Sequence, residues 1–372
     1  MAPMRVLIVG AGMAALETVM ALHALAGDRV AIALIAPEAE LVYHPIAAKP
    51  PYAVGRMRRI PLERLMADAG AQRFALNVSA VEPAPRVVRT TAGREYEYDE
   101  LVLALGADPL PVVQHATTWD DRTGADTLGG LVRDFEPGYS RRLAVVIPSG
   151  PVWRLRGYEL ALILTQDARG MGLKIETSLV TPERSPLEML GEEAVTAVSE
   201  ALREVGVAVV FASQVEVEPG QPQVLVAHPS GQRVDVDRVV ALPTLRGRPI
   251  PGVPVDEHGF VEIDEHCRVK GLEHIWAVGD ITTFPVKSGG MASEQADVAA
   301  EAIAAAAGAD VEPRAFDPAG RGELAGLPAG RYLEPWLETD GAAASTTSLP
   351  TLGVPIVTYL ERDFSAGWRG KI

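Results

Sequence analysis

Short runs of aliphatic and β-branched residues alternate with longer segments of helical periodicity along most of the chain. The first run covers residues 5–9 and the second Val30–Ile35, with helical periodicity from residue 13 to about Leu25 between them. Runs that are apolar at every position are typical of strands covered on both faces. The pattern therefore predicts a parallel βαβ unit at the start of the chain.

A second unit with the same rhythm begins with the apolar run at residues 142–147. The pattern predicts further elements in the order helix, strand, helix and strand at 158–168, 175–180, 192–205 and 207–211. Near residue 277 another short strand leads through a loop into a long alanine-rich helix over 291–306. Strands that alternate with helices in this way indicate an α/β protein built from two Rossmann-like units, each with a mostly parallel sheet in three layers.

The first strand runs directly into a glycine-rich turn, Gly10-x-Gly12-x-x-Ala15, which opens the first helix. Gly10 allows the tight turn, Gly12 lets the backbone approach a pyrophosphate, and Ala15 lets the helix pack close to the strand. The helix N-terminus then faces the phosphates. This order predicts dinucleotide binding. The ribose-binding acid expected after the second strand is replaced by Ala36, and Glu38 is the nearest carboxylate, the alternative being a solvated loop residue.

The second unit keeps the rhythm but replaces the glycine turn with residues 148–157, which contain two prolines. Prolines remove amide donors, and Trp153 and Arg154 cannot admit a pyrophosphate as glycine does. Arg154 and Arg156 would contact a phosphate through their side chains, or serve packing or the surface. Glu183 lies just past the next strand, where it or a neighbour would meet a ribose.

Two later turns also carry candidate chemistry. Residues 103–106 and 277–280 each follow a buried run, and the second ends in Gly279-Asp280. The Asp280 carboxylate can accept hydrogen bonds from sugar-alcohol hydroxyls. Lys287 and the N-terminus of the helix at Met291 would stabilise an anionic ring edge, with a surface lysine as the alternative for Lys287.

Composition excludes several classes of function. The 372 residues include 34 Lys and Arg against 49 Asp and Glu, for a net charge of −15, which argues against general affinity for nucleic acid or a polybasic membrane surface. With neither a signal peptide nor an uncharged stretch long enough to span a bilayer, a cytoplasmic protein is expected.

The single Cys267 excludes a dithiol within one chain, and we expect it in a surface hairpin. The histidines show no metal-ligand spacing, so no metal is expected.

Taken in order, the Gly10 turn, residues 103–106 and residues 277–280 resemble the FAD-dependent pyridine nucleotide-disulfide oxidoreductase superfamily over about residues 4–306. The loop at Tyr43-His44-Pro45 and Pro285-x-Lys287-x-Gly289 are similar to the branch of sulfide:quinone oxidoreductases, flavocytochrome c sulfide dehydrogenases and type II NADH dehydrogenases. The resemblance implies a discontinuous FAD domain, a second NAD(P)-binding-like domain with a degenerate glycine motif, and a C-terminal extension. Their expected ranges are 1–110 with 245–310, then 111–244, and 311–372.

The same resemblance implies which residues contact the cofactor. The FAD-binding set is Gly10, Gly12, Met13, Ala14, Ala15, Ala36, Pro37, Glu38, Pro45, Val78, Ala104, Leu105, Gly106, Gly279, Asp280, Lys287, Gly290 and Met291. The candidate catalytic residues are Lys287, Glu159, which matches a glutamate near the flavin, and Trp153, which either stacks against a ring near the flavin or only packs.

One departure from the family limits the chemistry. Sulfide:quinone oxidoreductases need paired redox cysteines, one of them shortly before the Tyr158-Glu159 pair, and this chain has Trp153 there. A dithiol cannot be built from one thiol, so persulfide and disulfide chemistry are not expected.

The sequence therefore predicts an FAD-dependent oxidoreductase that moves electrons from a small reduced donor, foremost NAD(P)H as a substrate, through the flavin to a small acceptor such as a quinone. The alternative is an FAD-bound module that senses redox state or binds a partner with little turnover. Residues 352–368 would contact a membrane peripherally, cover the flavin or form a homodimer contact.

Overall fold

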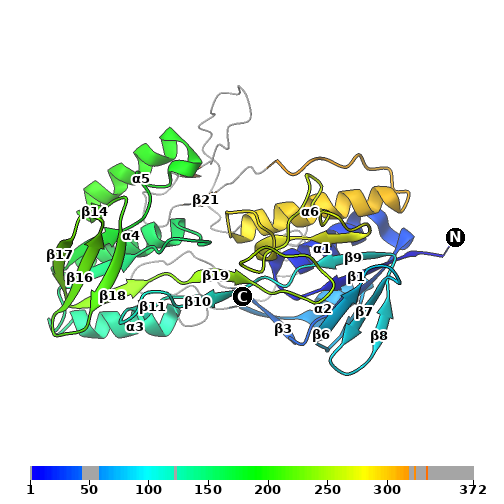
Figure 1. Cartoon of the computed structure of the whole chain (residues 1–372), viewed down its shortest axis with the longest axis horizontal. Helices are drawn as coiled ribbons and strands as arrows, with labels where there is room; N and C mark the ends of the chain where they lie inside the picture. The colour runs from blue at the N-terminus through cyan, green and yellow to red at the C-terminus, as the bar shows by residue number, and fades with distance from the viewer. Residues whose placement is uncertain (1, 44–57, 121–123, 318–321, 324–331, 334–372) are drawn as a thin grey trace, which may run out of the picture.

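The computed structural model describes residues 2–43, 58–120, 124–317, 322–323 and 332–333. Pro45 and most of the predicted C-terminal extension, including residues 352–368, lie outside the described residues. Figure 1 shows two units side by side, each built around a five-stranded parallel sheet. We call the unit that contains the N-terminus the first unit and the other the second unit.

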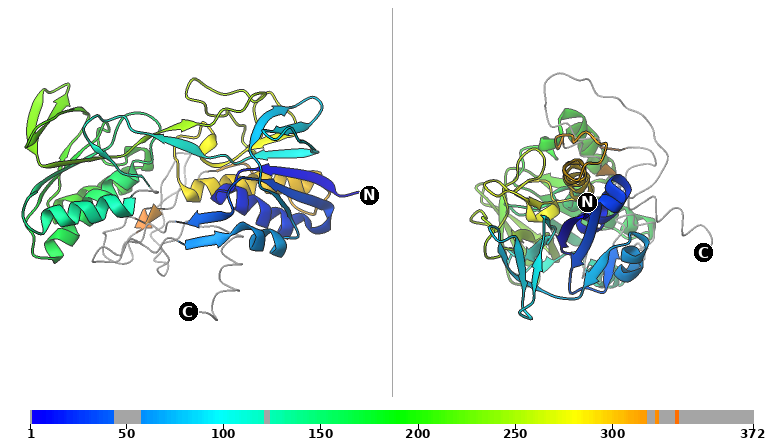
Figure 2. Two further views of the ribbon diagram at one scale, coloured as in Figure 1. Left: turned by 90° about the horizontal axis from the view of Figure 1, so that it is seen from below. Right: turned by 90° about the vertical axis from the view of Figure 1, so that its right-hand side faces the viewer.

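The sheet of the first unit has the strand order β20-β9-β1-β2-β5, and all of its strand pairs are parallel. These strands are β1 (Met4–Val9), β2 (Val30–Ile35), β5 (Gln72–Phe74), β9 (Glu100–Leu103) and β20 (Ile275–Ala277). Helices α1 (Met13–Ala26) and α6 (Gly289–Ala306) run side by side on one face (Figures 1 and 2). The other face is covered by the antiparallel strands β6 (Val78–Glu82), β7 (Val87–Thr90) and β8 (Glu95–Glu97).

The second unit repeats this plan with the strand order β11-β18-β12-β13-β14. Its parallel strands are β11 (Thr117–Thr118), β12 (Arg142–Val146), β13 (Glu176–Val180), β14 (Ala208–Val210) and β18 (Arg238–Ala241). One face packs against α3 (Gly124–Phe135), α4 (Leu155–Gly170) and α5 (Glu192–Val205). The other face packs against β15 (Gln214–Glu218), β16 (Gln223–His228) and β17 (Gln232–Val236).

Strand burial explains why consecutive positions in the centre of a run are apolar. In β1, Val6 and Ile8 join the core on the helix side of the sheet, whereas Leu7 and Val9 join the core on the opposite side. Because both faces of the sheet are covered, residues 6–9 are all buried, whereas Arg5 at the start of the run is exposed. The predicted α/β class with two Rossmann-like units is therefore confirmed.

Two short antiparallel strands connect the units. They are β10 (Ala107–Leu110) and β19 (Thr244–Gly247), and the Arg248 side chain donates to Asp108 Oδ1 at 2.6 Å and to the Leu105 carbonyl at 2.9 Å. The predicted domain boundaries fall within this pair and stay predictions. The other elements are β3 (Glu40–Tyr43), β4 (Arg58–Pro61), α2 (Leu62–Asp68), β21 (Gly322–Glu323), β22 (Tyr332–Leu333) and three 3₁₀ turns at Gly27–Arg29, Glu188–Leu190 and Gly279–Ile281.

The two units match residue by residue after their second strands. The amide of Ala36 donates to the Phe74 carbonyl at 3.0 Å, and in the same place the amide of Thr181 donates to the Val210 carbonyl at 3.1 Å. Ala36-Pro37-Glu38 and Thr181-Pro182-Glu183 therefore occupy equivalent positions. Glu38 and Glu183 are counterparts.

The units differ in the turn between the first strand and its helix. Residues 10–12 separate β1 from α1, whereas residues 147–154 separate β12 from α4, so the second turn is five residues longer (8 against 3). Counted from the helix starts, Gly157 is the counterpart of Ala15. A Cβ at Gly157 would lie 2.4 Å from Ile147 Cγ1, so this glycine permits close packing of helix against strand.

The packing of Gly157 gives a prediction about stability. Gly157→Ala should lower the free energy of unfolding by about 1–3 kcal/mol, because the new methyl group overpacks Ile147. In an Ile147→Ala background the same substitution should cost less than about 0.5 kcal/mol, since residues in contact are not additive. Urea unfolding measures both values.

Gly170→Ala in the same helix is the matched control. A Cβ there meets no atom within 4 Å, so alanine should leave stability unchanged or raise it by up to about 1 kcal/mol. Equal costs of Gly157→Ala in the two backgrounds would contradict the packing role of Gly157.

Candidate functional site

Most of the predicted cofactor residues that are described follow the carboxyl ends of the first sheet's strands. Gly10, Ala36, Ala104 and Val278 come directly after β1, β2, β9 and β20. The amide of Ala104 donates to the Val9 carbonyl at 2.8 Å, and that of Val278 to the Leu103 carbonyl at 3.0 Å. Because parallel strands end at one edge, these turns meet there, at the place where open α/β sheets bind ligands.

Gly10 and Gly12 have different structural roles. Gly10 has φ +119°, and a Cβ there would lie 2.2 Å from the Ala104 carbonyl oxygen, so the fold itself requires glycine. A Cβ at Gly12 would meet no atom within 4 Å. Gly12 is the N-cap of α1, no side chain caps that end, and no acidic residue stands in the first turn. The helix N-terminus at Met13 and Ala14 is therefore open to an anion, as a pyrophosphate requires.

Gly279 brings the ends of two helices to this edge. It has φ +78°, and a Cβ there would lie 3.1 Å from the Ala14 Cβ and 3.4 Å from the Ala292 Cβ. Its amide donates to Gln295 Oε1 at 2.7 Å. Asp280 follows, partly exposed. Desolvation raises the pKa of its carboxyl group, while the charges of Lys287 and Arg156 oppose that shift.

Lys287 is buried, with 5% of its surface exposed, so the alternative of a surface lysine is wrong. Its Nζ donates to the Asp280 carbonyl at 3.2 Å and to the Thr282 carbonyl, and lies 4.0 Å from the centroid of the Phe260 ring. Burial lowers its pKa to about 8. The side chain thus holds the turn that carries Asp280. A role in catalysis stays a prediction.

The remaining predicted residues lie along the same edge. Glu38 and Pro37 are exposed beyond β2, and the Glu38 carbonyl accepts a hydrogen bond from Arg73 Nη2. Val78 begins β6, a short distance beyond β5. Three further predicted positions are Leu105, Gly106 and Gly290. A Cβ at either glycine would meet no atom within 4 Å, and Gly106 has φ +68°. Met291 is buried, and its amide donates to the Ser288 N-cap.

The second unit contributes Glu159 and Trp153. Glu159 is buried in α4, and Trp153 packs against the helix-side core of that unit. Between the units, Arg156 interacts electrostatically with both Glu159 and Asp280, which oppose the lowering of its pKa by burial. Its guanidinium group lies 5.9 Å from the centroid of the Trp119 ring. Sequence reasoning missed Trp119, which directly follows the two threonines of β11, where no apolar run marks a strand.

Cys267 lies in the turn of a hairpin whose flanks pair antiparallel at Ile263 and Val269, as expected. It is fully buried in the helix-side core of the first unit, so its expected position at the surface is wrong. Burial raises the pKa of the thiol. Because the thiolate is the reactive form, this position disfavours nucleophilic chemistry.

Glu183 is directed differently from its counterpart Glu38. Only 3% of its surface is exposed. Its Oε2 accepts hydrogen bonds from the Tyr158 hydroxyl at 2.7 Å and the Thr181 hydroxyl at 3.1 Å. Burial raises the pKa of its carboxyl group. The carboxylate of Glu183 is therefore turned into the protein in this structure. The expectation that Glu183 or a neighbour meets a ribose stays a prediction.

Comparison with known proteins identifies the family of this chain. The model of the pyridine nucleotide-disulphide oxidoreductase family matches residues 4–306. The chain belongs to this family. The predicted family membership is therefore confirmed.

Curated relatives include an NADH dehydrogenase-like protein of Mycobacterium tuberculosis (strain H37Rv), which is 30% identical over 242 residues. The match covers 60% of this chain and 58% of that protein, so the chain spans little more than half the length of this relative. The counterpart from strain CDC 1551 matches equally.

Solved structures share the fold at lower identity. The sulfide:quinone oxidoreductase of Aquifex aeolicus has a TM-score of 0.69 and 19% identity, over 81% of this chain and 76% of that one. Putidaredoxin reductase, in its covalent complex with putidaredoxin, has a TM-score of 0.60 and 23% identity, over 87% and 80%. Among the described residues, no helix has the length and apolarity needed to cross a membrane.

The two glycines of the first turn give a matched prediction. Gly12→Ala should leave unfolding within about 1 kcal/mol of the native protein, since no atom is displaced, while the methyl group blocks the approach of a pyrophosphate and weakens FAD binding at least about tenfold. Gly10→Ala should instead destabilise the fold by about 2–5 kcal/mol, through strain and overlap with Ala104. Calorimetry and flavin fluorescence separate the two effects, and an unaltered FAD affinity in Gly12→Ala would contradict this assignment.

Lys287 gives a prediction about pH. Its folded pKa of about 8 lies below that of an unfolded lysine, about 10.4, so between these values the unfolded chain binds more protons. Stability should therefore rise with pH across this window relative to Lys287→Met, and the difference should level off below about pH 8, where lysine is protonated in both states. Denaturant unfolding of the cofactor-free protein at several pH values measures the difference. Parallel curves for the two proteins would contradict it.

Proposed function

We propose that this protein is an FAD-dependent oxidoreductase that passes electrons from a small reduced donor to the flavin directly, and from the flavin to a small acceptor such as a quinone. One observation carries the proposal: the uncapped N-terminus of α1 at Gly12 opens onto the sheet edge that also presents Asp280. NAD(P)H is the donor that the NADH dehydrogenase-like relatives suggest.

The residues at the edge fit the parts of FAD. The Gly10–Gly12 turn and the α1 N-terminus would hold the pyrophosphate, and Glu38 the adenosine ribose. Asp280 would accept hydrogen bonds from the ribityl hydroxyls. The turn fixed by Lys287 and the N-terminus of α6 at Gly290 would face the pyrimidine edge, where a positive field stabilises a reduced flavin. FAD supplies the two-electron chemistry when it is bound.

Direct transfer follows from the position of the one cysteine. Cys267 lies in a hydrophobic core, and its thiol has a raised pKa. A dithiol relay between donor and flavin would need two thiols. The donor must therefore lie against the flavin itself, and electrons and proton pass between them without a protein sulfur.

The longer second turn favours an alternative, an FAD-bound module with little turnover that responds to redox state or binds a partner. The eight-residue turn of residues 147–154 replaces the glycine turn through which a second dinucleotide would be held. A flavin that no small donor reduces, together with a stable protein partner, would favour this alternative.

The test is an anaerobic titration of the flavin-loaded protein with NADH and then NADPH, followed by the visible absorption band of the flavin. Reduction by either donor, and reoxidation by a soluble quinone, are expected. Cys267→Ala should give rates within about twofold of the native protein, because the thiol has no part in the transfer. A protein that takes up no FAD would refute the proposal, and loss of reduction in Cys267→Ala would refute direct transfer.

A further inference from the structure

The repeat between the two units allows a residue-by-residue comparison of their nucleotide edges. In the first unit Glu38 is exposed, and in the second its counterpart Glu183 is buried. A carboxylate at this place serves a dinucleotide by accepting hydrogen bonds from ribose hydroxyls. Glu38 is able to do so, whereas Glu183 is turned into the protein.

Two substitutions between the units explain the difference. Counted from the helix starts, Leu16 of α1 is the counterpart of Tyr158 of α4, and Ala36 is the counterpart of Thr181. The first unit therefore has two apolar side chains where the second has two hydroxyl groups. Both hydroxyls donate to Glu183 Oε2, and Tyr158 and Thr181 are each fully buried.

The surroundings of Glu183 do not present its carboxylate to a ligand at the surface. Oε1 is buried and has no hydrogen-bond donor among the described residues. Desolvation favours the protonated acid. If the Glu183 side chain left this site, the buried hydroxyl groups of Tyr158 and Thr181 would lose their acceptor. Buried polar groups without hydrogen-bond partners are costly.

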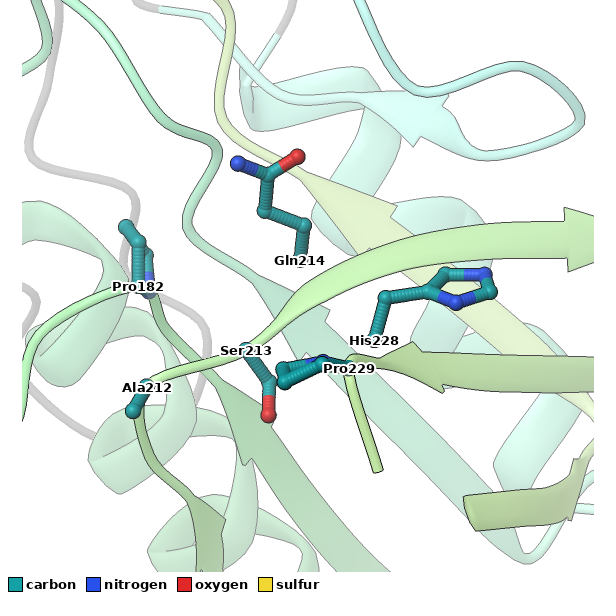
Figure 3. A pocket seen from close by; sticks show the side chains of 6 residues that line it. All are labelled: Pro182, Ala212, Ser213, Gln214, His228 and Pro229. Carbon is teal, nitrogen blue, oxygen red and sulfur yellow. The ribbon is translucent and has the colours of Figure 1, made fainter. Parts of the chain in front are cut away.

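Pro182, which stands between Thr181 and Glu183 in the sequence, lines a surface pocket of about 340 Å³ (Figure 3). It is lined by Pro182, Ala212, Ser213, Gln214, His228 and Pro229. Gln214 follows Val210 by four residues, as Val78 follows Phe74, so the pocket occupies the counterpart of the edge where Val78 is predicted to meet adenine. Glu183 is not among its lining residues, and no other carboxylate replaces it there.

We propose that Tyr158 and Thr181 withdraw Glu183 from the edge of the second unit, so that this unit does not recognise the adenosine half of a dinucleotide. The donor is then recognised through its redox-active ring, which a reduced nicotinamide supplies with or without an adenosine half, rather than through an adenosine ribose. The five additional residues in the turn before α4 also disfavour a dinucleotide. The second unit lacks the short glycine turn that in the first unit leads directly to the helix N-terminus, where backbone amides would meet a pyrophosphate. This inference rests on the proposed function and specifies the class of donor.

The first test compares NADH with reduced nicotinamide mononucleotide, which has the same hydride donor and lacks the adenosine half. If the second unit does not recognise adenosine, their second-order rate constants for anaerobic flavin reduction should agree within about threefold. A dinucleotide site with two hydrogen bonds to the ribose would favour NADH by about 100-fold or more. Such a preference would overturn the proposal.

Binding of ADP-ribose provides a readout that needs no turnover. Titration calorimetry of the flavin-loaded protein should detect no binding of ADP-ribose up to millimolar concentrations. Binding with a Kd below about 0.1 mM would overturn the inference even if neither nicotinamide compound reduced the flavin. A protein that binds no FAD would instead refute the proposed function, so the two failures are distinguishable.

Matched variants at the counterpart positions complete the design. Glu183→Gln keeps the shape of the side chain and should leave the ratio of NADH to mononucleotide rate constants unchanged within about twofold. Glu38→Gln should weaken FAD binding at least about tenfold, because the equivalent carboxylate of the first unit is exposed to the ribose. A tenfold loss of NADH reduction in Glu183→Gln, with the mononucleotide unaffected, would show that Glu183 does contact the ribose.

Discussion

The candidate site depends on how closely backbone segments approach one another at the carboxyl edge of the first sheet. Gly10 lies so near the Ala104 carbonyl that any side chain would overlap it. Gly279 packs less tightly, since a Cβ there would lie 3.1 Å from the Ala14 Cβ and 3.4 Å from the Ala292 Cβ, at the starts of α1 and α6. These contacts fix the ends of two helices against two strand ends, and they leave Gly12 facing open space. A rigid edge with one open helix N-terminus is what an extended anionic cofactor needs.

The chain uses the same supersecondary plan twice with different outcomes. Both units have parallel strands, helices on one face and an antiparallel meander on the other. Chemistry on such a fold is decided by the turns at the sheet edge. In the first unit a short turn and the exposed Glu38 are open to a ligand. In the second, a longer turn and two hydroxyl groups replace these features, so the fold is retained without the same site.

The central strands could be predicted from the sequence because their apolar runs reflect burial on both faces, as in β1 and β12. Elements without such a run, such as α3, β3 and β4, were not predicted. The turns at Gly10 and Gly279 were also predictable, since each follows such a run. The burial of Cys267 and Lys287 could not be predicted from the sequence, because it results from packing between segments that are distant in sequence. The contact of Lys287 with the Phe260 ring is an example. The equivalence of Glu38 and Glu183 had a visible signal: both follow an apolar strand and a proline. The different burial of Glu38 and Glu183 had no visible signal in the sequence, because the burial of Glu183 depends on Tyr158 in another element.

Charged side chains of the two units interact electrostatically at the place where the flavin ring would lie. Asp280 loses solvation at the turn, and its nearby positive charges come from Lys287 of its own unit and Arg156 of the other. Arg156 is in turn influenced by Glu159, so carboxylates on both sides of the boundary share one guanidinium group. In a poorly solvated region such interactions are stronger than in water. The second unit therefore contributes to the electrostatics of the candidate flavin site through Arg156, in the first turn of α4.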